Sequence, residues 1–217
     1  MPEPRSAPRP VVAVFDVDGT LTTGDCVLPF LRQAAGRRLV TAILRHPLAL
    51  AAGLVRRDRD RLKALACASL VGIPAAEIER LAEAVDLGEA FARDVAATRL
   101  RDDTAARLRR HRELGHTVVL ASASLDPYLV PLGRLLAADE AVCTMLERGA
   151  DGRLTGRLAG PNCRGAEKAR RVRALLGERG LQEAEVWAYG DSDGDEPLLA
   201  SADHALRVDG VHVPPDP

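Results

Sequence analysis

Two carboxylates separated by one residue, Asp16 and Asp18, directly follow the apolar run at residues 11–15. In an extended backbone, side chains two residues apart point to the same side, so both acids can face one substrate. Gly19 then allows the chain to turn immediately. One acid of such a pair can act as a nucleophile while the other carries protons, and aspartyl-phosphate formation is a known use of that nucleophile. The pair therefore predicts covalent acid/base chemistry.

A second acidic cluster, the segment GDSDGD at residues 190–195, follows the apolar run at residues 186–189. Carboxylate oxygens are hard ligands that suit Mg²⁺. The spacing also resembles an EF-hand calcium loop, but the twelfth position from Asp191 is Ala202, where that loop needs a bidentate glutamate. The cluster therefore predicts a magnesium site.

Two further polar residues occupy positions that suit phosphate binding. Ser122 follows the apolar run that begins at Thr117, and its hydroxyl can donate to a phosphoryl oxygen without adding charge; we assign Ser124 to capping the helix after it. Lys168 lies near the first turn of a predicted helix, where a cation opposes the helix dipole, so its function is predicted to be neutralisation of phosphate and nucleophile. Together the four clusters supply what phosphoryl transfer needs.

The elements that must position these residues alternate between strands and helices. Short apolar runs predict buried parallel strands, and the segments between them have helical patterns with glycine stops. This alternation predicts an α/β fold with a Rossmann-like three-layer parallel sheet, in which ligands bind at the carboxyl ends of the strands. The predicted strands are residues 11–15, 117–120, 141–145, 186–189 and 204–208, and the predicted helices are 102–114, 126–136 and 165–176.

The region between residues 23 and 98 breaks the alternation. It contains Ala-, Leu- and Arg-rich helical stretches and no convincing strand, so we predict an all-helical cap inserted after the first strand. A second departure is residues 145–158, where Asp151-Gly152 between alternating segments predicts a β-hairpin. The predicted organisation is a flexible tail of residues 1–10, a core of residues 11–22 and 99–213, and a cap of residues 23–98.

Composition narrows the class of protein. The 217 residues carry a net charge of -1, which gives no electrostatic basis for nucleic-acid binding. Four widely spaced cysteines without a CxxC pair favour reduced thiols and a cytoplasmic location. The proline-rich start lacks the apolar core of a signal peptide.

The apolar stretch 39–55 (LVTAILRHPLALAAGLV) is interrupted by Arg45, His46 and Pro47. A membrane span needs about 20 mostly apolar residues, so spanning is disfavoured. We expect a buried pair of helices broken at Pro47. The alternative is an apolar surface that faces lipid or substrate.

The order DVDGT, Ser122, Lys168 and GDSDGDEPLL resembles the four motifs of the haloacid dehalogenase (HAD) superfamily. More narrowly, the chain is similar to the phosphoserine-phosphatase-like branch (subfamily IB), whose helical cap lies between the first and second motifs. The resemblance covers nearly the whole chain after the tail. It implies a phosphatase that uses Mg²⁺, and the second acid, Asp18, favours phosphate esters over the dehalogenase reaction.

Roles follow from the resemblance position by position. Asp16 is implied as the phosphorylated nucleophile and Asp18 as the acid/base. The residues assigned to phosphate binding are Ser122, Lys168, Gly19 and Thr20. The implied magnesium ligands are the carboxylates of Asp16 and Asp191 and the main-chain carbonyl of Asp18, with Asp195 supporting the metal or its waters.

The resemblance weakens in the cap, where family members that hydrolyse phosphoserine use a glutamate and an arginine. The first corresponds roughly to Asp25, and near the second the closest cation is Lys63. Lysine cannot replace arginine in binding a carboxylate through two hydrogen bonds. Asp25 and Lys63 are therefore candidate specificity residues, but they do not identify phosphoserine as the substrate.

The function expected from the sequence is Mg²⁺-dependent hydrolysis of a small phosphorylated metabolite through an aspartyl-phosphate. A phosphotransferase or phosphomutase would share the first half-reaction. A phospho-accepting signalling module is also an α/β fold with an acidic site, but it needs neither a cap nor a second carboxylate such as Asp18.

Overall fold

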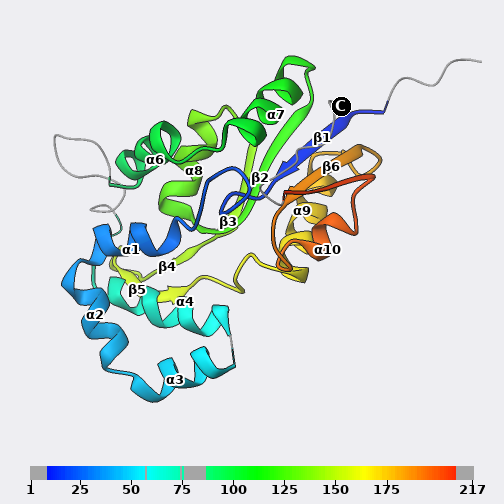
Figure 1. Cartoon of the computed structure of the whole chain (residues 1–217). Helices are drawn as coiled ribbons and strands as arrows, with labels where there is room; N and C mark the ends of the chain where they lie inside the picture. Colours follow the sequence, from blue (N-terminus) through cyan, green and yellow to red (C-terminus); the bar gives the residue numbers. More distant parts are fainter. Residues whose placement is uncertain (1–8, 57, 74, 76–86, 209–217) are drawn as a thin grey trace, which may run out of the picture.

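The computed structural model describes residues 9–56, 58–73, 75 and 87–208. A parallel sheet forms the centre of the molecule, with helices on both of its faces, and a mostly helical part lies beyond one end of the sheet (Figure 1). The predicted α/β class with a Rossmann-like core is confirmed.

The sheet contains five parallel strands in the order β3-β2-β1-β6-β7. The first strand is central, and the chain adds strands on one side of it before crossing to the other side. The five strands are β1 Val11–Phe15, β2 Thr117–Leu125, β3 Glu140–Thr144, β6 Glu185–Gly190 and β7 His204–Arg207. All five predicted strands are present, and β2 continues five residues past its predicted end at Leu120.

Two hydrophobic layers cover the two faces of the sheet. Alternate residues of β1 take opposite sides: Ala13 and Phe15 belong to one core cluster, Val12 and Val14 to the other. Helices α7 (Asp102–Glu113) and α8 (Asp126–Leu135) pack on the first face, and α9 (Ala166–Glu178) and α10 (Glu196–Leu199) on the second. Each large apolar side chain buried here contributes on the order of 2 kcal/mol of transfer free energy, so the layers fix the strands that carry the site.

All the secondary-structure elements described in the region predicted as a cap are helices. Its elements are α1 Val27–Ala35, α2 Arg37–Leu44, α3 Pro47–Val55, α4 Arg59–Cys67, η1 Ala68–Leu70 and α6 Leu87–Thr98. A bridge between Thr22 and Leu100 joins the two ends of the insertion. The last helix, α6, packs on α8 of the core, where the rings of Phe91 and Tyr128 are 5.1 Å apart, so we propose that the cap in space is formed by α1 to η1.

The predicted hairpin is confirmed and lies against the cap. Strands β4 (Leu146–Arg148) and β5 (Leu154–Leu158) pair antiparallel. Leu154 donates its backbone N–H to the carbonyl of Ile73 (2.8 Å) and accepts from the N–H of Gly72 (2.9 Å). These bonds attach the hairpin to the segment after η1, beside α4 in Figure 1.

The ends of the chain lie partly outside the described residues, which leave out 1–8 and 209–217. Arg9 and Pro10, assigned from the sequence to a flexible tail, are instead held at the start of β6. The carbonyl of Pro10 accepts from the N–H of Glu185 (2.8 Å), and the Arg9 guanidinium donates to the carbonyls of Glu183 and Ala184.

The apolar stretch 39–55 forms the expected pair of helices, because α2 ends at Leu44 and Pro47 begins α3 after a bend of 84°. The expectation that this pair is buried was wrong: Leu48 is 85% exposed and Val55 is 84% exposed. Among the described residues no single helix has the length and apolar character to cross a membrane, while this bent pair meets that test by length and composition alone.

Candidate active site

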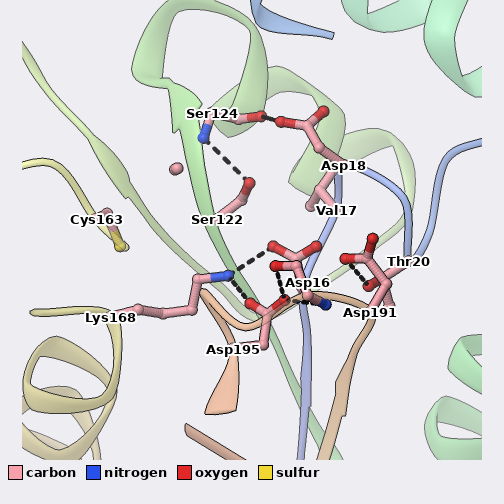
Figure 2. A network of polar contacts seen from close by, with 12 residues as sticks. Asp16, Val17, Asp18, Thr20, Ser122, Ser124, Cys163, Lys168, Asp191 and Asp195 are labelled. Atoms are coloured by element: carbon pink, nitrogen blue, oxygen red, sulfur yellow. Dashed lines mark hydrogen bonds and ion pairs between the residues drawn. The ribbon is translucent and has the colours of Figure 1, made fainter. Parts of the chain in front are cut away.

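The carboxyl ends of β1, β2 and β6 meet at one edge of the sheet and open into a pocket of about 690 Å³ beneath the cap. Residues of the core loops form its floor, and residues of α1 and α4 form its walls. The Asp16 N–H donates to the Tyr189 carbonyl at 2.9 Å, which extends the β1–β6 pairing to the first catalytic candidate. The sequence clusters predicted to meet at this edge do so (Figure 2).

Asp16 and Lys168 form a buried ion pair at the floor. The Lys168 ammonium donates to Asp16 Oδ1 at 2.6 Å and also to Asp195 Oδ1, and all three side chains are at least 93% buried. Burial raises the pKa of Asp16 to about 7, because it outweighs the opposing charge of Lys168. Burial by itself would lower the pKa of Lys168, but the two carboxylates raise it overall, so the lysine stays charged.

Asp18 is held by two donors on the side of the site nearest the cap. The Ser124 hydroxyl donates to Asp18 Oδ2 at 2.6 Å, and the Cys26 N–H donates to Oδ1 at 2.9 Å. Burial raises the pKa of Asp18, while these two donors oppose that shift. A carboxyl whose pKa is raised holds its proton more readily near neutral pH, which suits a general acid.

The assignment of Ser124 to a helix cap was wrong. Helix α8 follows Leu125, and no side chain caps its first turn. Because β2 stays extended to Leu125, Ser124 points back towards β1 and reaches Asp18. The sequence signal was the spacing Ser122-x-Ser124 on one strand, since residues two apart share a side.

Ser122 lies in the wall of the same pocket and is buried. Its Oγ accepts the N–H of Ser124 at 3.1 Å, which leaves the hydroxyl proton available to a ligand. The structure therefore places Ser122 and Lys168 together with Asp16 around one space.

Gly19 and Asp191 are in close contact. A Cβ added at Gly19 would come within 2.3 Å of Asp191 Oδ2, and the Gly19 φ of 91° is one that L side chains rarely adopt. Only glycine lets this carboxylate approach the first motif so closely. The Asp191 side chain is half-buried, and burial raises its pKa.

Thr20, assigned from the sequence to phosphate binding, points elsewhere. It is fully buried and does not line the pocket; its hydroxyl donates to Asp191 Oδ1 at 3.3 Å. The carbonyl of Thr20 accepts from the Thr104 hydroxyl at 2.7 Å. The threonine therefore orients a carboxylate instead of contacting the pocket.

Three carboxylates are arranged so that they could share a metal ion. Ligand atoms of Asp16, Asp191 and Asp195 all lie within 4.8 Å of one another. Both Asp195 oxygens are occupied, one by Lys168 and the other by the N–H (3.1 Å) and hydroxyl (2.8 Å) of Ser192, and these contacts lower its pKa although burial opposes them. Three acids against one lysine leave an excess of negative charge, which fits a divalent cation with hard oxygen ligands.

The two cap residues singled out in the sequence both line the pocket but are engaged differently. The exposed Asp25 accepts the backbone N–H of Val27 (3.3 Å) and of Leu28 (3.1 Å) at the start of α1. Lys63 extends from α4 to the core, where its ammonium donates to the Ala123 carbonyl and to acceptors on Thr144 and Asn162.

Asn162 and Arg164 line the pocket and were missed as functional candidates. Asn162 Oδ1 accepts from Lys63 (2.8 Å) and from the Thr144 hydroxyl (2.7 Å), while its amide donates to Asp60 at 2.6 Å. The guanidinium of Arg164 lies over Gly194, where an added Cβ would be 2.8 Å from Nε. Both precede Lys168 in the segment NCRGAEK, whose polar character was the available signal.

Comparison with known proteins places these features in one family. The family model for haloacid dehalogenase-like hydrolases matches residues 13–200. Protein CicA of Caulobacter vibrioides is 40% identical over 196 residues, which are 90% of this chain and 84% of CicA. Phosphoserine phosphatase SerB1 of Mycobacterium tuberculosis is 30% identical over 199 residues, 90% of this chain and 64% of SerB1. A solved structure described as a phospho-aspartyl intermediate analogue of phosphoserine phosphatase has a TM-score of 0.61 at 17% identity, covering 92% of this chain and 86% of that one.

Proposed function

The chain belongs to the haloacid dehalogenase-like hydrolase family, as its motifs predicted, and we propose that it is a Mg²⁺-dependent phosphatase acting on a small phosphomonoester through an aspartyl-phosphate on Asp16. The observation that carries the proposal is that the two acids at the end of β1 have different hydrogen-bond partners, one charged and the other neutral. Asp16 is paired with a buried cation, and Asp18 is held by neutral donors. Different surroundings are what give two carboxyl groups different roles.

The reaction has two steps. A carboxylate oxygen of Asp16 attacks phosphorus, the bond from phosphorus to the ester oxygen breaks, and Asp18 gives its proton to the departing alcohol. Asp18 then takes a proton from a water molecule that attacks the phosphorus of the aspartyl-phosphate. Inorganic phosphate leaves, and both acids return to their starting forms.

Lys168 and Ser122 support both steps. The buried ammonium neutralises charge on the nucleophile and on the phosphoryl group as they approach each other, which matters most where water is excluded. The Ser122 hydroxyl adds a neutral donor to a phosphoryl oxygen.

Asp16 and Asp191 would hold the magnesium ion, because Oδ2 of each accepts no hydrogen bond among the described residues and both line the pocket. Asp195 would support the ion from its fixed position beside Lys168, and the main-chain carbonyl of Asp18 remains the proposed further ligand. A bound Mg²⁺ would supply positive charge to the phosphoryl oxygens.

The pocket indicates the chemical class of the substrate. The wall formed by the cap is largely apolar, with Val27, Leu28, Leu31, Leu62 and Ala66. The Lys63 ammonium is bonded to acceptors of the core, so we propose that it holds the cap in place. Asp25, Arg59 and Arg164 are then the charged groups of the pocket wall proposed to meet the leaving group. SerB1 is a phosphoserine phosphatase by name, and Arg59, on the same cap helix as Lys63, lines the pocket, so phosphoserine is one candidate among several phosphomonoesters.

The four cysteines are all buried and free. Free thiols persist in reducing compartments, and we propose the cytoplasm as the location of the enzyme.

Phosphate release tests the proposal directly. The protein is assayed without an added acceptor over amino-acid, sugar, alcohol and lysolipid phosphates, with Mg²⁺ and again with excess EDTA. We expect release with at least one class that stops in EDTA and returns with Mg²⁺. Turnover that needs an added phosphoryl acceptor would identify a phosphotransferase, and stable labelling of Asp16 without turnover would identify a phospho-accepting module.

A further inference from the structure

Large apolar side chains are exposed on the outer helices of the cap. Five of those in the described part of the chain lie on two consecutive short helices, and we call them the apolar tip: Val40, Leu44, Leu48, Leu54 and Val55. Their exposed fractions run from 58% to 85%. Contiguous exposed apolar residues on this scale mark a surface that binds something.

The helical spacing arranges these side chains in stripes. On α2, Val40 and Leu44 are four residues apart and therefore lie on one face, while Leu39, on a different face, is buried. On α3, Leu48 and Val55 are seven residues apart and again share a face. Figure 1 shows α2 and α3 at the end of the molecule farthest from the sheet, with α4 packed on one side of α3.

The charged side chains of α2 and α3 have one sign, and the nearest acids in the sequence after them, Asp58 and Asp60, are at the start of α4. Residues 26–57 contain six arginines and no aspartate or glutamate, although the whole chain has 31 acids and a net charge of -1. Five of these arginines are described, and all five are exposed: Arg32, Arg37, Arg38, Arg45 and Arg56. The ion pairs found among the described residues include none of them.

We propose that α2 and α3 form a docking face for the surface of an anionic lipid bilayer. Exposed leucine and valine can enter the boundary between headgroups and acyl chains, while arginines beside them pair with lipid phosphates. Each helix has eight or nine residues, which at 1.5 Å per residue is far shorter than a hydrocarbon core of about 30 Å. The helices therefore lie on the bilayer and do not cross it.

A second copy of the chain fits this face less well. In a two-fold dimer the same patch meets itself, so the unpaired arginines of one copy would face those of the other without intervening acids. An anionic bilayer is complementary to this face in both respects, because it offers apolar chains to the leucines and valines and negative charge to the arginines.

The test is co-sedimentation of the full chain with lipid vesicles. Wild-type protein is expected to bind phosphatidylcholine vesicles that contain phosphatidylglycerol, to bind pure phosphatidylcholine weakly, and to dissociate as salt approaches about 1 M, where the screening length is about 3 Å. The double substitution Leu48→Ser/Val55→Ser should weaken binding by about tenfold or more. Arg37→Gln/Arg38→Gln should weaken it by roughly fivefold for each arginine.

Matched control variants separate docking from general effects. Val130→Ser/Leu135→Ser removes two exposed apolar side chains from α8, and Arg109→Gln/Arg173→Gln removes two exposed arginines from α7 and α9; both should bind vesicles like wild type. Melting temperature and phosphate release from a water-soluble substrate should be unchanged in the tip variants, because none of these residues lines the pocket. The proposal is overturned if wild type does not sediment with the anionic vesicles at low salt, if Leu48→Ser/Val55→Ser binds them equally well, or if light scattering shows a dimer that this double variant abolishes.

Discussion

The core and the outer cap differ in how their charged and apolar side chains are buried and paired. In the core, Asp16, Lys168 and Asp195 are buried and paired with one another, and the apolar side chains are covered on both faces of the sheet. On α2 and α3 five leucines and valines are exposed, and no ion pair among the described residues involves the arginines of these helices. Because a buried charge is stable only with its partners in place, the core tolerates few arrangements. The cap surface is under no such restriction, so we infer that the core fixes the reaction and the cap determines what reaches it.

The largest effect on activity is expected when a buried carboxylate of the core is changed, compared with an exposed carboxylate nearby. Asp16→Asn should abolish phosphate release, a loss of about 10⁴-fold or more, because an amide cannot form the covalent intermediate. The matched change Asp193→Asn, on a side chain that is 97% exposed in the adjacent loop, should leave the rate within about twofold. Steady-state phosphate release measures both, and Mg²⁺-dependent turnover by Asp16→Asn would remove the proposed nucleophile.

The core should also make stability depend on pH. His111 is fully buried: its Nε2 lies 2.8 Å from the Tyr189 hydroxyl and its Nδ1 lies 2.8 Å from Nδ1 of His116. Burial, with smaller contributions from His116 and Arg107, lowers its pKa to about 4, whereas an unfolded histidine titrates near 6.5.

At His111 the unfolded chain therefore binds more protons between these values, so the stability contributed by this histidine, complete above about pH 6.5, falls as the pH drops towards 4. Asp16, whose pKa is raised, contributes with the opposite sign. We therefore expect the His111 contribution, a loss on the order of 2 kcal/mol between pH 7 and pH 5, as the difference between wild type and His111→Gln. Urea unfolding at several pH values measures it. His111→Gln should lose less stability than wild type as the pH falls from 7 to 5, and His46→Gln on the exposed cap should follow wild type. Equal slopes in all three proteins would contradict the assignment.

A smaller effect on kcat is expected from removing the hydroxyl of a buried serine in the core, compared with a buried serine in the cap. Ser124→Ala removes a donor to Asp18, so kcat should fall by roughly ten- to a hundredfold, within the usual contribution of an acid/base group. The pH dependence of kcat should shift upward, because Ser124 helps to lower the pKa of Asp18. Ser69→Ala in the cap removes a hydroxyl that donates only to the Ala66 carbonyl and should not affect kcat.

The Asp18→Asn variant provides the reference for that test. It should be slower than Ser124→Ala, most of all with an alcohol of high pKa as leaving group. If Ser124→Ala and Asp18→Asn show the same pH profile as wild type, the proton carrier has been assigned to the wrong residue.

The smallest effect is expected where the two regions meet. Lys63→Met removes an ammonium that connects α4 to Thr144 and Asn162. The loss of these hydrogen bonds to a charged group should lower the free energy of unfolding by about 2 kcal/mol. Amide hydrogen exchange should become faster in α4 and remain unchanged in β2, and KM should rise more than kcat falls. Arg61→Met lies on the same helix, and among the described residues its ion pair is to Asp58; it should change neither. Equal exchange in α4 for all three proteins would contradict the role of Lys63 in holding the cap.

Much of the fold could be predicted because its signals are local. The strand at residues 11–15 and the Asp-Gly turn at 151–152 depend on apolar runs and turn residues that are visible within a few positions. The exposure of Leu48 and Val55 could not be predicted, since an apolar run has the same pattern whether or not another element covers it.

The site shows the same division. The sequence by itself determined that Asp16, Asp18 and Asp191 follow strand ends, because residue types mark the boundaries between strands and loops. Only the tertiary structure decided that Ser124 holds Asp18, that Thr20 turns to Asp191, and that Lys63 crosses from cap to core. These contacts join residues between 60 and 171 positions apart, and their partners are chosen by how layers pack, a property that no local pattern records.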